Sequence, residues 1–236
     1  MHISIIIPIY NEGNIIQENL IKIYNFFDNK FKFEIIVVDD CSTDNSLIKL
    51  HSMNLENLKI ISNKKNEGKG YSINKGIMNS KGNMILTTDA DLSAEIEEFN
   101  KLFVFLKKGY SIVIGSRSKK NSIININQSF YRVFQGKIFN LLVRLLFGLN
   151  YKDTQCGFKL YDSNKIKSII KLCKVNRFCA DVEILYLAKL NKISVIEEGI
   201  VWNDNVCSSV KLLTDPINMI YDLFKIKFTK YNQIKN

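Results

Sequence analysis

Residues 84–91 read MILTTDAD, an apolar run that leads directly into two aspartates. A short run rich in apolar and β-branched residues is typical of a strand that is buried on both faces of a sheet. The start of the chain has the same design, since residues 2–12, HISIIIPIYNE, are apolar up to Pro8 and then become polar. We expect the first strand to stop at Pro8, because proline has no backbone N–H for the strand ladder.

Runs of this kind alternate with helical patterns along the first half of the chain. We expect strands at 3–7, 34–38, 58–61, 84–88 and 111–114, and helices at 15–27, 45–53, 71–78 and 96–106. This alternation predicts an α/β fold, a mostly parallel sheet with helices on both faces. Ligands of such sheets bind beyond the carboxyl ends of the strands. Four of the five expected strands end in polar clusters: Tyr10-Asn11-Glu12, Asp39-Asp40, Asp89-Ala90-Asp91 and Ser116-Arg117.

Composition limits the classes of partner and compartment. The 236 residues fit a single domain over 1–236, and the net charge of +10 favours an anionic partner. Nucleic acid is disfavoured, because no basic block is interleaved with aromatic residues and no zinc-ligand spacing occurs. The 5 cysteines lack CxxC spacing, which fits a reducing compartment. With neither a signal peptide nor an apolar run long enough to cross a bilayer, we expect a cytoplasmic protein, or one lying on a membrane surface.

Two later stretches, 130–148 and 215–230, combine apolar residues at helical spacing with lysine and arginine. Basic amphipathic helices of this kind lie in membrane interfaces. The same spacing is also typical of a helix that packs on the protein core. Both interpretations stay open at this point.

Three polar clusters are candidates for ligand binding. If the chain stays extended, Asp89 and Asp91 lie on one face, where two carboxylates suit Mg²⁺ or Mn²⁺; the alternative is capping of the next helix. Asp39 and Asp40 could accept hydrogen bonds from a nucleobase or ribose, or belong to a helix cap. Lys69 lies in NEGKG, residues 66–70, which is either a phosphate-binding loop or a simple turn.

The order of the motifs resembles the family-two glycosyltransferases of the GT-A fold. The motifs are PIYNE (8–12), VVDDCSTD (37–44), NEGKG (66–70) and TDAD (88–91), with Cys41 where that family usually has glycine. In the second half, the motifs GSR (115–117), FYR (130–132), DTQCGFK (153–159), FCADVE (178–183), VW (201–202) and SSVK (208–211) resemble the polyprenyl-phosphate glycosyltransferases, with the dolichyl-phosphate β-glucosyltransferases as the nearest group.

The resemblance implies a role for each matching residue. It assigns the nucleotide pocket to Pro8, Tyr10, Glu12 and Asp39, and the diphosphate and metal to Asp89 and Asp91. It assigns the acceptor phosphate to Arg117 and Arg132, and the sugar and acceptor side to Asp153, Gln155, Asp181 and Glu183. Lys211 would close over the donor. Residues 1–118 would then form the nucleotide-sugar half and 119–236 the acceptor half, with 130–148 and 215–230 at the membrane interface.

The function implied is a metal-dependent, inverting transfer of a hexose to a polyprenyl phosphate, either dolichyl or undecaprenyl phosphate. UDP-glucose is the favoured donor, with GDP-mannose as an alternative, and Mg²⁺ or Mn²⁺ is the cofactor. A phosphate monoester with a second pKa of about 6 needs no general base, whereas a hydroxyl acceptor would need Asp153 or Asp181. We expect peripheral binding to the cytoplasmic face of a membrane.

Two alternatives remain open from the sequence. One is a soluble family-two transferase that acts on a glycan hydroxyl in cell-surface polysaccharide synthesis. The other is a nucleotide-sugar-binding protein without catalytic activity.

Overall fold

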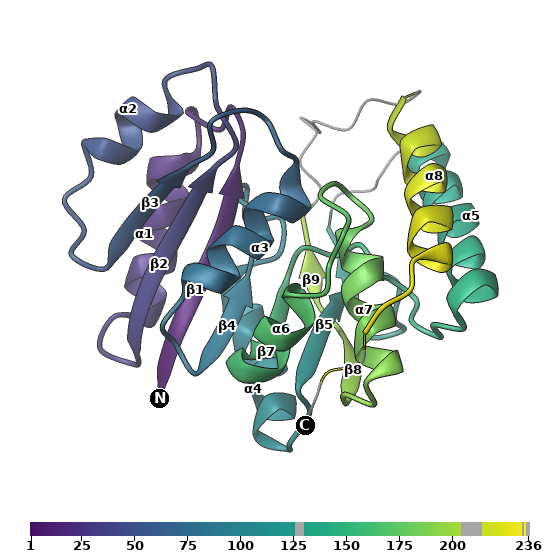
Figure 1. Cartoon of the computed structure of the whole chain (residues 1–236). Helices are drawn as coiled ribbons and strands as arrows, with labels where there is room; N and C mark the ends of the chain where they lie inside the picture. The colour runs from purple at the N-terminus through teal and green to yellow at the C-terminus, as the bar shows by residue number, and fades with distance from the viewer. Residues whose placement is uncertain (126–129, 204–213, 233, 235–236) are drawn as a thin grey trace.

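A seven-stranded sheet forms the centre of the computed structural model, which describes residues 1–125, 130–203, 214–232 and 234 (Figure 1). The strand order is β3-β2-β1-β4-β7-β5-β8. The strands are β1 (His2–Ile9), β2 (Lys32–Asp39), β3 (Leu58–Ser62), β4 (Met84–Thr87), β5 (Ile112–Ser116), β7 (Lys159–Asp162) and β8 (Val195–Gly199). A separate two-stranded parallel sheet joins β6 (Ile123–Ile124) to β9 (Val201–Trp202).

Helices cover both faces of the large sheet. They are α1 (Ile16–Phe27), α2 (Ser46–His51), α3 (Lys69–Asn79), the short 3-10 helix η1 (Ile96–Glu98), α4 (Phe99–Lys107), α5 (Phe130–Phe147), α6 (Ser163–Ile170), α7 (Ala180–Leu190) and α8 (Thr214–Phe228). Because strand side chains alternate, Ile5 of β1 packs in the core beneath α1 and α4, whereas Ile6 packs in the core beneath α3, α6 and α7. The predicted α/β fold with a doubly covered sheet is confirmed.

All strand pairs of the large sheet are parallel except those made by β7. This strand runs antiparallel between β4 and β5, and β8 then adds in parallel to β5. Strands from the second half of the chain therefore complete the sheet begun by the first half. The division of the chain into a donor half and an acceptor half stays a prediction.

The expectation that Pro8 ends the first strand is wrong, since β1 continues through Pro8 to Ile9. Along β1 the groups facing β4 recur at every second residue, and Thr88 N–H donates to Ile6 O at 3.1 Å. The next N–H that β4 could use would be that of Pro8, which is missing. Pairing of β1 with β4 accordingly ends at Ile6, while pairing with β2 continues to Ile9. Proline ends one ladder of this strand and leaves the other intact.

The carboxyl ends of β1 and β4 meet at the point where the strand order reverses. From β1 the chain adds β2 and then β3 on one side, and it returns to place β4 on the other side of β1. Loops leave such a point in opposite directions, which opens a crevice for ligands. The sheet therefore brings together the polar residues that follow β1 and β4.

Helices α5 and α8 lie side by side at one edge of the molecule, to the right in Figure 1. Lys227 Nζ of α8 donates to Leu146 O of α5 at 2.6 Å. Both helices match the predicted stretches 130–148 and 215–230 closely. Within the described ranges, no helix combines the length and the apolar character that a membrane span requires.

Side-chain hydrogen bonds join the turns after β1 and β2. Asn11, at φ +58°, accepts a hydrogen bond at its Oδ1 from Thr43 N–H (2.7 Å), and its own N–H donates to Ser42 Oγ (2.9 Å). The second turn contains Cys41 at φ +65°. This is the left-handed region, which costs a residue with a Cβ about 1–2 kcal/mol.

We predict that Cys41→Gly raises the free energy of unfolding. Relief of the left-handed strain exceeds the extra chain entropy of glycine, about 0.5–1 kcal/mol, so the net gain is about 0.5–1 kcal/mol. Urea titration measures it. Cys41→Ala, which keeps the Cβ, serves as the control and gains nothing; an equal gain from alanine would disprove the strain.

Candidate functional site

The two aspartates that follow β4 lie in a tight turn. Leu92 N–H donates to Asp89 O at 3.2 Å, and Leu92 has a φ of +49°. The Asp91 carboxylate accepts hydrogen bonds from Ser93 N–H (3.0 Å) and Ser93 Oγ (2.7 Å). The chain therefore turns here and does not stay extended, because this local hydrogen bonding favours a turn.

Lys69, the first residue of α3, forms an ion pair with Asp89, with 2.5 Å between Nζ and Oδ1. Burial alone would raise the pKa of Asp89, but the charge of Lys69 lowers it below its usual value. Gly157 lies against the same carboxylate, and a Cβ there would come within 2.4 Å of Asp89 Oδ2. The close fit therefore requires glycine at 157, and the charge of Lys69 keeps Asp89 ionised.

Glu12, in the turn after β1, has a pKa raised to about 7. The main cause is burial, followed by the negative charges of Asp91 and then Asp89. Carboxylates from the β1 and β4 turns thus repel one another across the crevice, and a cation would relieve this repulsion.

Asp89 and Asp91 have the right chemistry to hold Mg²⁺ or Mn²⁺. Over the residues that the structure describes, no three carboxylate, imidazole or thiol side chains converge as a complete metal site. A cation here would therefore share its coordination between a few carboxylate oxygens and the phosphates of a substrate, an arrangement that Mg²⁺ prefers. Asp89 and Asp91 therefore suit a divalent cation that binds together with a phosphate-bearing substrate.

Asp39 and Asp40, predicted to contact the nucleotide, are both buried and bonded to the chain. Asp40 accepts hydrogen bonds from Gly68 N–H (2.8 Å), Glu67 N–H (2.9 Å) and Asn63 Nδ2 (2.8 Å). It therefore fixes the glycine loop that carries Lys69. Asp39 accepts a hydrogen bond at its Oδ1 from the Ser42 N–H at 3.2 Å.

The two remaining residues of the predicted nucleotide pocket lie at the end of β1. Pro8 is partly buried, and the Tyr10 side chain is 42% exposed. An exposed ring at the carboxyl edge of the sheet is accessible to a ligand. The nucleotide contacts of these residues stay a prediction.

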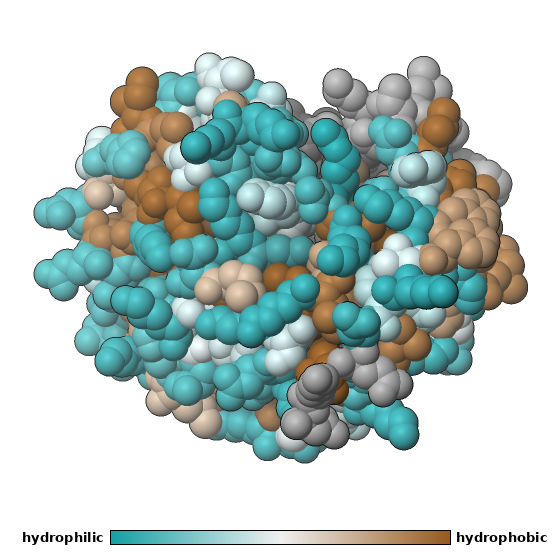
Figure 2. Space-filling view, in the orientation of Figure 1, coloured by the Kyte–Doolittle hydropathy of each residue, from teal (hydrophilic) through white to brown (hydrophobic). Residues whose placement is uncertain are grey.

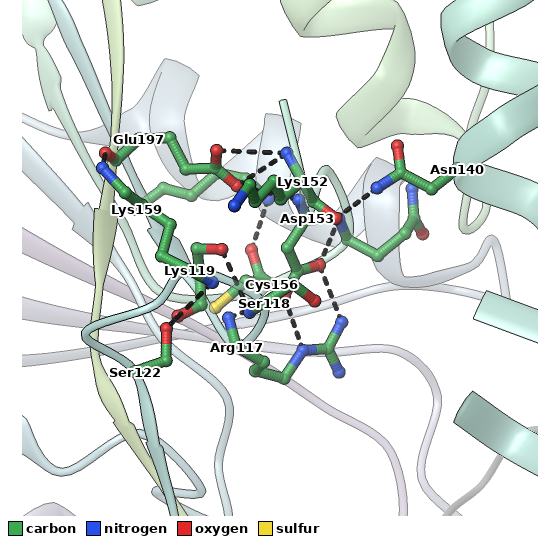
Figure 3. A network of polar contacts seen from close by, with 12 residues as sticks. Arg117, Ser118, Lys119, Ser122, Asn140, Lys152, Asp153, Cys156, Lys159 and Glu197 are labelled. Atoms are coloured by element: carbon green, nitrogen blue, oxygen red, sulfur yellow. Dashed lines mark hydrogen bonds and ion pairs between the residues drawn. The ribbon is translucent and has the colours of Figure 1, made fainter. Parts of the chain in front are cut away.

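Arg117 and Asp153 form a bidentate ion pair, shown in Figure 3. Arg117 Nε lies 2.7 Å from Oδ2 and its second nitrogen lies 2.9 Å from Oδ1, while the Arg117 backbone N–H adds a bond of 3.0 Å. The guanidinium also stacks over the Trp202 ring at 5.0 Å from its centroid. Glu197 accepts a hydrogen bond from the Asp153 N–H at 2.8 Å and so holds Asp153 in place. The orientation of the Arg117 side chain in the site is therefore fixed by Asp153.

A third ion pair joins Lys159 of β7 to Asp181 of α7, with 2.5 Å between Nζ and Oδ1. The Lys159 side chain is only 2% exposed, and its Nζ also donates to Cys156 O at 2.5 Å. Sequence reasoning gave Lys159 no role. The signal was present, since this lysine interrupts an apolar run between Phe158 and Leu160.

Asp181 lines a cavity between α3 and α7, together with Lys69, Asn74 and Gln155. The buried atoms Asn74 Oδ1 and Gln155 Nε2 have no hydrogen-bond partner among the described residues. Buried polar atoms are normally satisfied, so these point to a polar ligand or to water. Asn74 was not identified from the sequence.

Three further residues of the sequence prediction lie elsewhere or outside the described side chains. Glu183 is fully buried and accepts hydrogen bonds from Lys174 N–H (2.7 Å) and Val175 N–H (2.9 Å), so it anchors a loop. Arg132 belongs to α5, but its side chain lies outside the described residues, as does Lys211 entirely.

Comparison with known proteins gives consistent matches. The sequence model described as "Glycosyl transferase family 2" matches residues 4–170. Dolichyl-phosphate beta-glucosyltransferase of Dictyostelium discoideum is 33% identical over 97% of this chain and 74% of its own length. The protein of the same name from Saccharomyces cerevisiae is 32% identical over 95% of this chain and 74% of its own length.

Among solved structures, similarity extends over nearly the whole chain. Glucosyl-3-phosphoglycerate synthase from Mycobacterium tuberculosis, in complex with Mn²⁺, UDP-glucose and phosphoglyceric acid, gives a TM-score of 0.68 at 16% identity, covering 97% of this chain and 80% of the other. S. aureus TarS in complex with UDP-GlcNAc gives a TM-score of 0.62 at 20% identity, covering 96% and 66%. At these identities the similarity shows the fold alone.

We predict that Lys159 and Asp181 stabilise the fold as a coupled pair. Asp181→Asn leaves a buried ammonium without its counter-charge and costs about 3 kcal/mol, because breaking a buried pair costs more than the pair contributes. Adding Lys159→Met to that variant costs much less than Lys159→Met does alone. Urea unfolding of the four proteins measures the coupling.

The exposed Lys22–Glu18 pair on α1 supplies the control. The same cycle of substitutions there gives no measurable coupling, since exposed pairs are screened by water. Additive effects at Lys159 and Asp181 would show that the two charges act independently.

Proposed function

This chain belongs to glycosyl transferase family 2, and on that premise we propose that it transfers a hexose from a nucleotide sugar to a polyprenyl phosphate such as dolichyl phosphate. The observation that carries the proposal is the 33% identity over 97% of the chain to a protein named as a dolichyl-phosphate beta-glucosyltransferase. UDP-glucose is the proposed donor. The M. tuberculosis structure of the same fold, solved with UDP-glucose, supports it.

The donor diphosphate lies, in this proposal, at the crevice between the β1 and β4 turns. Asp89 and Asp91 would hold Mg²⁺ or Mn²⁺, which when bound neutralises charge on the leaving diphosphate. Lys69 starts α3 at the same crevice, so its ammonium and the helix N-terminus both favour phosphate. Tyr10 and Asp39 are proposed to contact the nucleoside.

Transfer is proposed to be a single displacement. An oxygen of the acceptor phosphate forms a bond to the anomeric carbon, while the bond from that carbon to the diphosphate oxygen breaks and its electron pair leaves with the diphosphate. Attack from the face opposite the leaving group inverts the configuration. The acceptor phosphate is largely ionised at neutral pH, so no proton has to be removed.

The geometry favours a phosphate acceptor over a hydroxyl acceptor. A hydroxyl would need a general base, and the sequence candidates were Asp153 and Asp181. Burial would raise the pKa of Asp153, but the charge of Arg117 lowers it below its usual value, which makes a poor base. The Asp181 carboxylate is engaged in its ion pair with Lys159, with 2.5 Å between Nζ and Oδ1. Asp153 occupies Nε and one terminal nitrogen of Arg117, and we propose that the other terminal nitrogen donates to the acceptor phosphate.

We also propose that the outer faces of α5 and α8 lie on a membrane. Helix α8 is apolar on two sides: Leu223 and Ile226 pack inward, while its outer side carries exposed large residues. The exposed set is Ile217 (70%), Ile220 (43%), Tyr221 (70%), Phe224 (47%) and Phe228 (79%), with Ile138 (46%), Leu141 (56%) and Leu145 (73%) on α5. We call this set the apolar stripe. Figure 2 shows hydrophobic colours gathered over the α5 and α8 edge of the molecule.

Basic residues border the apolar stripe. Lys137, Arg144, Lys225, Lys227 and Lys230 are all exposed on or next to the two helices. Apolar residues flanked by lysine and arginine on a surface helix are typical of binding to anionic bilayers. A stripe of this size facing water is unusual for a monomeric soluble surface.

We predict that Phe224→Ser with Phe228→Ser weakens binding to phosphatidylglycerol vesicles by more than about tenfold, because two large apolar side chains no longer enter the interface. Co-sedimentation at low salt measures the partition. Ile48→Ser with Val104→Ser removes exposed apolar residues from α2 and α4 (74% and 49% exposed) and serves as the control. Equal binding by both variants would rule out the stripe as the membrane face.

A donor panel tests the reaction itself. Purified protein is incubated with dolichyl phosphate or undecaprenyl phosphate, Mg²⁺ or Mn²⁺, and UDP-glucose, other UDP-hexoses or GDP-mannose. We expect a lipid-linked sugar with UDP-glucose, and about a 10²-fold lower kcat for Asp91→Asn, which loses negative charge at the diphosphate. Asp28→Asn, in the loop after α1, is the control and keeps full activity. No lipid-linked product with any donor would refute the proposal, and full activity of Asp91→Asn would refute the metal role.

A further inference from the structure

A basic cleft lies between the loop after β3, the segment before α7, and α8. Six charged side chains line it: Lys65, Glu67, Lys174, Arg177, Asp222 and Lys225. Four of them are basic and two are acidic, so the cleft carries a surplus of positive charge. Figure 1 shows the segment before α7 between α3 and α8.

Among the described residues, Lys174 and Arg177 have neither a carboxylate within 4.0 Å nor a side-chain hydrogen bond. Lys65 lies 3.6 Å from Glu67, and Lys225 Nζ donates to Lys174 O at 3.3 Å. For the Arg177 guanidinium and the Lys174 ammonium, no carboxylate of a described residue lies within 4.0 Å. Asp222 interacts electrostatically with Lys225 and Arg177, but at distances beyond that of an ion pair. The cleft therefore offers an anion at least two cations, Lys174 and Arg177, that no described carboxylate neutralises.

The segment that carries these cations is fixed by backbone hydrogen bonds. Glu183 accepts from the N–H groups of Lys174 and Val175, and it is itself held by Tyr231, whose hydroxyl donates at 2.6 Å. Asn176 O accepts from Tyr71 N–H of α3 at 2.8 Å. None of these bonds uses the side chains of Lys174 or Arg177. The backbone of the segment is thus fixed, so that binding has to order only the two side chains.

The cleft connects two features already described. Arg177 also lines the cavity that contains Lys69 and Asp181. On its other side the cleft reaches Lys225 of α8, which adjoins Phe224 of the apolar stripe. An anionic group in the cleft could therefore belong to a molecule whose apolar chain lies along α8.

We propose that the basic cleft binds the phosphomonoester head of a lipid, with Lys174 and Arg177 as the main contacts and the lipid chain on α8. This rests on the proposed function, since it gives the acceptor a route from the membrane to the site. Charge-assisted bonds from arginine and lysine to phosphate are short and strong, and a bidentate arginine contact adds geometric selectivity.

The test uses the full chain with Lys174→Ala and Arg177→Ala combined, and calorimetric binding of citronellyl phosphate, a short soluble prenyl phosphate. We expect binding to weaken at least about tenfold, since two charge-assisted contacts are lost. Lys107→Ala with Lys108→Ala removes the same charge from α4 and is the control, with less than about a twofold change expected from long-range attraction alone. Equal weakening in both double variants would overturn the proposal.

Further arms identify the source of the phosphate. Citronellol, which lacks the phosphate, should not bind, and inorganic phosphate should bind more weakly than citronellyl phosphate. Inorganic phosphate binding as tightly as the prenyl phosphate would overturn the lipid assignment. In sugar-transfer assays, the double variant should raise the KM for the acceptor and leave the KM for the donor unchanged.

The binding and transfer assays distinguish failure of the proposed cleft from failure of the proposed function. Wild-type protein that binds citronellyl phosphate through these residues but transfers no sugar would refute the proposed function and leave the cleft standing. Transfer with an unchanged acceptor KM in the double variant would refute the cleft and leave the function standing.

Discussion

The ammonium group of Lys159 is a positive charge in the middle of a sheet, and the surrounding structure has to neutralise it. Asp181 at the start of α7 and the carbonyl of Cys156 do so. The same requirement recurs along the carboxyl edge, where Lys69 is paired with Asp89 and Arg117 with Asp153. Each pair joins segments distant in sequence, so charge pairing determines how α3, α7 and the 153–157 loop meet at the crevice. A diphosphate bound at this edge would offer these cations a new counter-charge in place of the aspartates.

The sequence was sufficient for the elements that follow simple periodicity. Strands β1 to β5 and the helices between them were predicted with small errors at their ends, because buried parallel strands read as continuous apolar runs. β7 was missed, since it has four residues, one of them Lys159, and is recognisable only from its neighbours β4 and β5. The course of the chain at Asp89 and Asp91 also depends on something local, the Ser93 hydrogen bonds and the positive φ of Leu92, which a spacing rule does not contain.

Candidate site residues divide in a similar way. Their positions at strand ends followed from the alternation of strands and helices, but their partners did not. Arg117 and Asp153 were predicted as separate contacts with substrate, and they form a bidentate pair across 36 positions of sequence. Asp40 and Glu183 were expected to face ligands, and both hold loops by accepting backbone N–H groups. A carboxylate that stabilises a loop and one that binds a substrate look alike in sequence, because both use the same oxygens.

The antiparallel β7 has a consequence for the order in which the chain can assemble during synthesis. β1 to β4 can pair as they leave the ribosome, because β2, β3 and β4 each contact a strand made before them. β5 cannot join them, since its partners in the sheet, β7 and β8, are both made later. Until residues 159–162 emerge, β4 has one open edge and β5 has two, and unpaired edges invite pairing with other chains. These strand edges therefore lack their partners while the residues between β5 and β7, including α5, are being translated.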